Sequence, residues 1–103
     1  MIKHIVMWKL KDLAEGCSRE ENAKKIKAML DALKGKIDQI SYLEVGINTI
    51  NSDMAYDAVL VSEFENVQRL EEYKKHPEHV KVSDFVAKVR ESRAVVDYFV
   101  ELE

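Results

Sequence analysis

Three segments of this sequence alternate as β-strands do, yet each places large apolar side chains on both of its faces. In residues 2–10, one face carries Val6 and Trp8 and the other carries Ile5 and Met7. A period of two residues is typical of a strand. A two-layer fold covers one face of its sheet with helices and leaves the other to water, where polar residues are expected. The sequence therefore predicts a sheet whose second face also needs an apolar cover.

Four segments in all are predicted to be strands. They cover residues 2–10, 40–50, 56–64 and 93–102. Only a polar turn cluster, Asn51-Ser52-Asp53, separates the middle two, and short turns of this kind join antiparallel neighbours. We therefore expect an antiparallel hairpin in the middle of the chain.

Two helices are predicted between these strands, because apolar side chains there recur every three or four residues. Ser18 is suited to cap the start of the first helix, and Gly35 is suited to end it. The second helix begins after Asn66 and must break near His76, since Pro77 disfavours a helical residue before it. Proline is welcome at the first position of a helix, so a new helix is expected to start at Pro77.

The order β-α-β-β-α-β predicts an α+β domain of ferredoxin-like fold with an antiparallel sheet. At 103 residues, without a linker or a repeat, the chain is expected to form one domain over residues 1–103. It has enough helix to cover one sheet face only. Pairing of the second face with the same face of another copy therefore predicts a homodimer. The alternative is that a long loop or a helix extension of the same chain covers that face.

The overall composition narrows the classes of partner. The formal net charge is −3, whereas nucleic-acid-binding domains normally carry a basic surplus, so we expect no nucleic-acid partner. The single cysteine, Cys17, leaves no intrachain disulfide and fits a reducing compartment. The start of the chain lacks the apolar segment of a signal peptide, and no apolar run approaches the length that spans a bilayer. The expectation is a cytoplasmic protein with no membrane partner.

Polar aromatic and imidazole side chains cluster at the predicted helix break, where Tyr73, His76 and His79 follow one another closely. The positive end of a helix dipole disfavours imidazolium in the first turn, so His79 is expected to be neutral and able to accept a proton. Tyr73 could donate a hydrogen bond to a substrate carbonyl. His4 lies on the same strand face as Trp8. A pocket made by these groups would lie within each protomer, between sheet and helices.

The alternative is that these residues serve structure alone. His76 would then cap the new helix, Tyr73 would belong to the core and His79 to the surface. A metal site is not expected, because His76 and His79 lack a third well-spaced ligand.

Several segments resemble the stress-responsive dimeric A/B barrel domain (Dabb) family, over nearly the whole chain. The most specific resemblance is in Tyr73 and the run His76-Pro77-Glu78-His79-Val80. Weaker resemblances lie in four other segments: Ile2-Lys3-His4-Ile5-Val6, Lys9-Leu10-Lys11-Asp12, Glu44-Val45-Gly46-Ile47-Asn48 and Asp97-Tyr98. The resemblance implies a ferredoxin-like protomer and a homodimeric α/β barrel made by two sheets.

The resemblance implies less about activity. A plant relative, olivetolic acid cyclase, closes a polyketide by aldol condensation with a tyrosine and a histidine, and the matching residues here are Tyr73 and His79. His4 matches a histidine beside that pocket and His76 a histidine of the motif, so both are expected to bind substrate.

Three functions stay open at this point. The first is a Dabb-type homodimer of unassigned activity that binds a small hydrophobic or carbonyl-containing molecule. The second is a cofactor-independent polyketide cyclase or aldol-type enzyme, with His79 as base and Tyr73 as the group that polarises a carbonyl. The third is a cofactor-independent monooxygenase-like member of the wider barrel superfamily.

Overall fold

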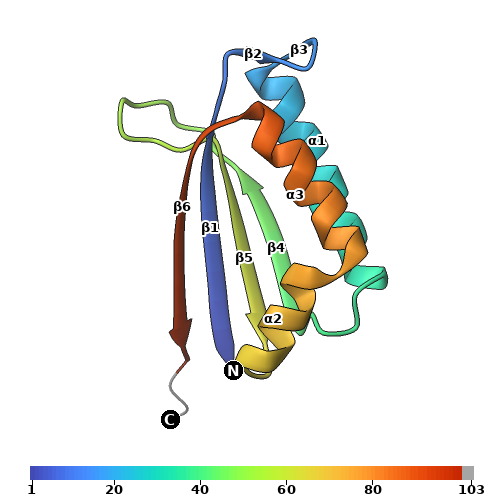
Figure 1. Ribbon diagram of the computed structural model, residues 1–103. Helices are drawn as coiled ribbons and strands as arrows, with labels where there is room; N and C mark the ends of the chain where they lie inside the picture. The colour runs from blue at the N-terminus through green and yellow to red at the C-terminus, as the bar shows by residue number, and fades with distance from the viewer. Residues whose placement is uncertain (101–103) are drawn as a thin grey trace.

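One four-stranded sheet and a layer of helices on one of its faces make up the fold (Figure 1). The computed structural model describes residues 1–100. The sheet strands are β1 (Ile2–Leu10), β4 (Tyr42–Ile47), β5 (Ala58–Phe64) and β6 (Arg90–Phe99), in the order β4-β5-β1-β6. The helices are α1 (Arg19–Asp31), the 3₁₀ turn η1 (Ala32–Gly35), α2 (Val67–Lys75) and α3 (Pro77–Val89). All strand pairs in this sheet are antiparallel, so the predicted ferredoxin-like α+β fold is confirmed.

The helix boundaries follow the local signals in the sequence, with one exception. The Ser18 hydroxyl accepts from the backbone N–H of Glu21 at 3.2 Å, and the Glu21 carboxylate accepts from the N–H of Ser18 at 3.0 Å. The exception is Gly35, which does not adopt the left-handed conformation of a glycine cap. Helix α1 instead ends at Asp31, and the chain tightens into η1, whose shorter hydrogen bonds satisfy the last carbonyl groups.

The strand boundaries differ from the predicted ones by a few residues. Strands β4 and β5 are shorter than residues 40–50 and 56–64, because the long turn between them takes up the flanking residues. The last strand begins at Arg90, three residues earlier than predicted, since it pairs with Leu10 directly after α3. Leu102, predicted in this strand, lies outside the described residues. Residues 11–18, predicted to be a plain connection, contain a small hairpin of β2 (Leu13–Ala14) and β3 (Cys17–Ser18).

The helix-side face of the sheet holds the apolar core. Its largest fully buried side chains are Tyr73, Phe64, Leu10, Ile26, Leu30, Leu33, Ile37 and Leu60. Two polar side chains of the sheet share this face and are also buried, His4 on β1 and Ser62 on β5. Strand β1 therefore presents His4 to the helices together with Val6 and Trp8, and its alternation predicted that these residues share one face.

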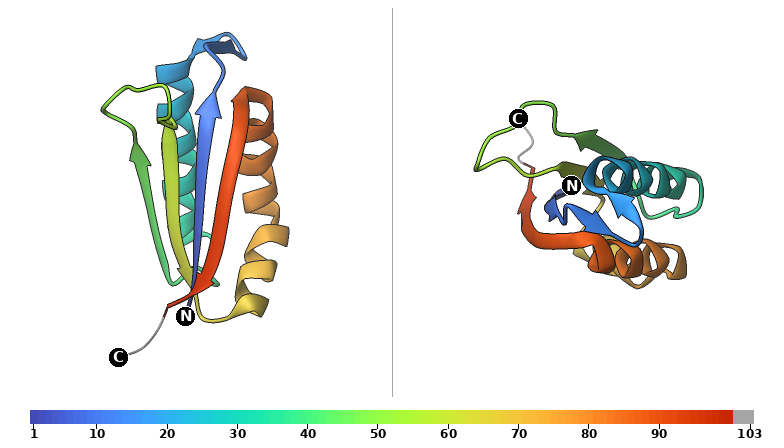
Figure 2. Two further views of the ribbon diagram at one scale, coloured as in Figure 1. Left: turned by 90° about the vertical axis from the view of Figure 1, so that its left-hand side faces the viewer. Right: turned by 90° about the horizontal axis from the view of Figure 1, so that it is seen from above.

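No described helix lies on the outer face of the sheet (Figure 2), and this face also carries apolar side chains. Strand pairing places these side chains on it: Tyr42, Ile5, Met7, Val59, Val61, Val96 and Tyr98. Val96 is 52% exposed and Met7 37% exposed, so no loop or helix among residues 1–100 covers this face. The alternative in which the chain covers its own second face is therefore not seen in the described part of the chain. Among the same residues, no helix is both long and apolar enough to cross a bilayer.

Candidate functional site

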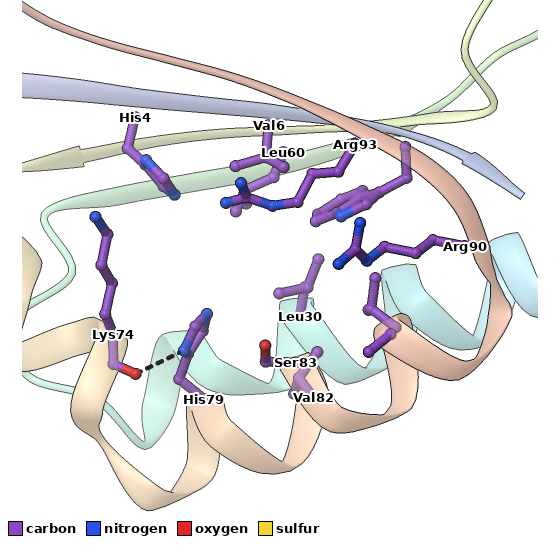
Figure 3. A pocket seen from close by; sticks show the side chains of 13 residues that line it. His4, Val6, Leu30, Leu60, Lys74, His79, Val82, Ser83, Arg90 and Arg93 are labelled. Atoms are coloured by element: carbon purple, nitrogen blue, oxygen red, sulfur yellow. Dashed lines mark hydrogen bonds between the residues drawn. The ribbon is translucent and has the colours of Figure 1, made fainter.

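A cleft of about 460 Å³ lies between the sheet and helices α2 and α3 (Figure 3). Apolar side chains from strands and helices line it, among them Val6, Leu60, Leu30 and Val82. Polar side chains surround them, namely His4, Lys74, His79, Ser83, Arg90 and Arg93. The volume lies within the range of small-molecule sites, which are mostly apolar with a few placed polar groups.

His79 is held in one orientation by the break between α2 and α3. Its ring Nδ1 lies 3.1 Å from the backbone oxygen of Lys74. A carbonyl oxygen only accepts hydrogen bonds, so Nδ1 carries the proton and donates it. In neutral imidazole the other nitrogen, Nε2, is then an acceptor, and the ring points this edge into the cleft (Figure 3).

The break itself makes this hydrogen bond available. In a continuous helix the Lys74 carbonyl would accept from the N–H of Glu78. Here Pro77 interrupts the helix, and the N–H of Glu78 donates to Nδ1 of His76 at 3.1 Å. The Lys74 carbonyl is thereby left for the ring of His79. His76, expected to bind substrate, is the N-cap of α3 and is not among the residues that line the cleft.

His4 faces the cleft from the sheet. It is 3% exposed, and its Nδ1 pairs with the carboxylate of Asp97, which lies directly across from it on β6. Burial is the main cause that lowers the pKa of His4, and the pairing with Asp97 partly offsets it. A neutral His4 donates from Nδ1 to Asp97, which leaves its Nε2 as an acceptor.

Burial likewise lowers the pKa of His79, partly offset by the hydrogen bond to Lys74. The positive charges of Arg93 and Lys74 lower it further. The helix dipole was expected to keep the His79 ring neutral. In the structure the main cause of the lowered pKa is instead desolvation by burial. Two neutral imidazoles thus face one cleft, each fixed by a hydrogen bond at Nδ1.

Tyr73 lies behind these two rings and is fully buried. Its ring centroid is 4.4 Å from that of His79, 6.4 Å from that of His4 and 4.8 Å from that of Phe64. Its hydroxyl has no hydrogen-bond partner within residues 1–100, and burial raises its pKa. The structure thus brings His4, Tyr73 and His79 together, although Tyr73 is not among the lining residues.

Two residues that line the cleft were not expected from the sequence, Arg90 and Arg93 at the start of β6. Arg93 pairs across from Trp8 and so shares the helix-side face with it. The alternation of the last strand contained this signal, but only the pairing of β6 with β1 shows which face of β6 meets the helices.

Residues 1–100 contain no group of three or more side chains that could together bind a metal ion.

Comparison with known proteins adds a family and a fold. The model of the Stress responsive A/B Barrel Domain, Dabb, matches residues 2–100. A stress-response A/B barrel domain-containing protein of Arabidopsis thaliana is 33% identical over 85 residues, or 80% of this chain. The chain spans 30% of that relative's length.

Solved structures share the fold over almost the whole chain. A dimeric ferredoxin-like protein of unknown function from Bacteroides fragilis is 38% identical, with a TM-score of 0.79 over 94% of this chain and 93% of that one. The hydroxynitrile lyase of Passiflora edulis has a TM-score of 0.80 over 97% and 93% of the two chains. At 15% identity this second likeness is one of fold alone, so any activity must be argued from the site itself.

Proposed function

The chain belongs to the stress-responsive A/B barrel (Dabb) family, and we propose that its cleft binds a small carbonyl compound on which His79 acts as a general base. Tyr73 lies behind the cleft lining and is the proposed hydrogen-bond donor to a carbonyl oxygen that reaches past the rings of His4 and His79. His4 is a second group beside the ligand. The observation that carries the proposal is the fixed His79 ring. Its Nδ1 is held by the Lys74 carbonyl, so an unprotonated Nε2 faces the cleft.

The chemistry that suits this arrangement is removal of a proton from the carbon next to a carbonyl group. His79 Nε2 takes the proton, and the electron pair of the C–H bond forms an enolate whose negative oxygen accepts from the Tyr73 hydroxyl. The enolate carbon then forms a C–C bond with a second carbonyl carbon. The oxygen of that carbonyl recovers the proton from His79. When both carbonyl groups belong to one molecule, the product is a ring, and no oxidant or reductant is consumed.

Three features support a base at this position. The lowered pKa of His79 keeps the ring unprotonated at neutral pH. The apolar middle of the cleft, made by residues such as Val6 and Leu60, fits the carbon skeleton of a ligand. The buried Tyr73 hydroxyl lacks a partner among the described residues, and leaving such a group unpaired costs about 1–3 kcal/mol. A carbonyl oxygen would supply the missing acceptor.

Deuterium exchange tests the proposal, because it measures the proton removal alone. The compound that supplies the second carbonyl group need not be known. Small ketones and keto acids are incubated with the protein in D₂O, and exchange at the carbon next to the carbonyl is followed by NMR. We expect wild type to accelerate exchange and His79→Gln to reduce the rate by about 10²–10⁴-fold, the usual contribution of a general base.

A matched control comes from the other histidine of the same motif. In His76→Asn, asparagine keeps a side-chain acceptor at the N-cap of α3, so the exchange rate should stay near that of wild type. Equal rates in wild type and His79→Gln would contradict the proposal. Binding of the same compounds without any exchange would favour the alternative of a binding protein. The monooxygenase alternative stays a prediction.

We also propose that two copies pair through their outer sheet faces. All four strands place apolar side chains on that face, and those of β1, β4 and β6 include exposed ones, which supports this pairing, as does the dimeric state of the Bacteroides fragilis relative. Light scattering should give twice the chain mass. Val96→Lys, on the outer face, should give the single mass, whereas Val95→Lys, the adjacent residue on the opposite face, should keep the double mass. A monomeric wild type at micromolar concentration would rule out the pairing.

A further inference from the structure

The cleft carries an excess of positive charge that the proposed proton transfer does not use. The chain as a whole has a net charge of −3. Yet three cationic side chains line the cleft, Lys74, Arg90 and Arg93, and no aspartate or glutamate is among the described lining residues. Asp97 borders this region, but its carboxylate pairs with His4. The cleft thus has the opposite charge to the molecule that contains it.

The two arginines of the cleft differ from the other two in the chain. Arg19 contacts the carboxylates of Asp12 and Asp57, and Arg69 contacts those of Glu65 and Glu72. Neither Arg90 nor Arg93 forms an ion pair with any residue from 1 to 100. Their guanidinium groups extend from β6 into the cleft (Figure 3). Lys74, by comparison, lies 3.5 Å from the Glu71 carboxylate.

The arginines also lie at a defined place relative to the histidines. Arg93 pairs across from Trp8, and Asp97 pairs across from His4, four residues further along β6. The backbones of Arg93 and Asp97 are therefore about 13 Å apart along β6. A long arginine side chain shortens that gap, and the charge of Arg93 is close enough to lower the pKa of both His4 and His79. A bound molecule could contact an arginine at one end and His79 at the other.

From this geometry we infer that the ligand of the cleft is a keto acid whose carboxylate binds Arg93 and Arg90 while its carbonyl group lies beside His79. This inference rests on the proposed function and adds the substrate class to it. A guanidinium group matches a planar carboxylate through two parallel hydrogen bonds. The apolar side chains between the two ends, Val6 and Leu60 among them, contact the carbon chain that links the two groups.

The experiment compares a keto acid with its neutral ester, using 4-oxopentanoate and its methyl ester as probes. Both contain the same ketone, so the deuterium exchange described above can be measured for each. We expect wild type to prefer the acid by about tenfold or more in kcat/KM, because a charge-assisted hydrogen bond contributes that much. Arg93→Gln should lose most of this preference through a higher KM for the acid. The preference is taken as the ratio of acid to ester within each variant, so any change in the His79 base on loss of Arg93 affects both compounds and cancels.

Arg69→Gln is the matched control, because it removes an arginine of α2 that lies outside the cleft lining. Its preference for the acid should equal that of wild type. Equal exchange of acid and ester by wild type would overturn the inference and leave the proposed general base intact.

A binding measurement tests the carboxylate site independently of the general base. NMR titration of 4-oxopentanoate should show salt-sensitive binding to wild type and to His79→Gln, and at least tenfold weaker binding to the double variant Arg90→Gln/Arg93→Gln. Such binding without exchange would support the carboxylate site and contradict the general base. Absence of binding to wild type would overturn the carboxylate site.

Discussion

The helix-side face of the sheet has two unlike halves. Over β4, helix α1 packs against the sheet, and side chains such as Ile26, Leu43 and Val45 are buried. Toward β6 the packing opens, and Val95 and Phe99 on that face are 48% and 67% exposed. The cleft with its histidines and arginines lies in this open half (Figure 3). One half of the face therefore stabilises the fold, and the other leaves room for a ligand.

The largest change in stability is expected from a cavity in the closed half, where α1 packs on β4. Ile26 of α1 is fully buried, so Ile26→Ala removes apolar contacts that the surroundings cannot replace. We expect a loss of about 2–5 kcal/mol in the free energy of unfolding, measured by urea denaturation. A loss below about 1 kcal/mol would mean that the closed half is packed less tightly than described.

A smaller effect of opposite sign is expected where the two halves meet, at Tyr73. Tyr73→Phe removes a buried hydroxyl that has no partner within residues 1–100, so the free energy of unfolding should rise by about 1 kcal/mol. Ser62→Ala is the matched control. Its buried hydroxyl donates to the His4 carbonyl at 2.9 Å, so its removal should lower stability by about 1 kcal/mol. Destabilisation by both variants would show that the Tyr73 hydroxyl is paired in solution.

The histidines of the open half should make the free energy of unfolding depend on pH. The pKa of His4 and of His79 is lowered from 6.5 in the folded protein, so the unfolded chain binds more protons as the pH falls past that value. The stability conferred by the neutral rings is thus complete above pH 6.5 and is lost as the pH falls toward the lowered pKa values. Denaturation between pH 7 and 5 should show this loss, with a shallower slope in His79→Gln. Identical slopes would exclude His79 as a contributor.

The smallest effect is expected at the exposed edge of the open half. Val95→Thr keeps a β-branched side chain on β6 and removes little buried surface, because Val95 is already half exposed. The free energy of unfolding should change by no more than about 0.5 kcal/mol. A larger loss would indicate that this edge is covered in the assembled protein.

Much of the fold could be predicted because its signals are local. Ser18 and Asn66 cap helices, and Pro77 starts one, through contacts within three residues of each. The alternation of β1 placed His4 on the same face as Val6 and Trp8 without knowledge of the other strands. Gly35 was predicted to end the first helix. The α-helix ends earlier, at Asp31, and Gly35 is instead the last residue of a 3₁₀ turn without the left-handed conformation of a glycine cap.

The candidate site was harder to predict because its parts come from distant segments. Tyr73 and His79 are close in sequence, and the short break between two helices brings their rings together. Arg93 enters the cleft only through the pairing of β6 with β1, which joins residues more than eighty positions apart. His76 could have been a ligand-binding residue or a cap, and only the contact with the N–H of Glu78 decides its structural role.

Strand β1 serves both surfaces of the protein, because its odd and even residues point to opposite sides of the sheet. His4 and Val6 face the cleft, whereas Ile5 and Met7 face outward. If two protomers pair through the outer faces, each cleft lies on the side of its own sheet that is opposite the interface. Titration should then count two ligands per dimer with a Hill coefficient of one. A variant that no longer dimerises should bind the same ligand with unchanged affinity.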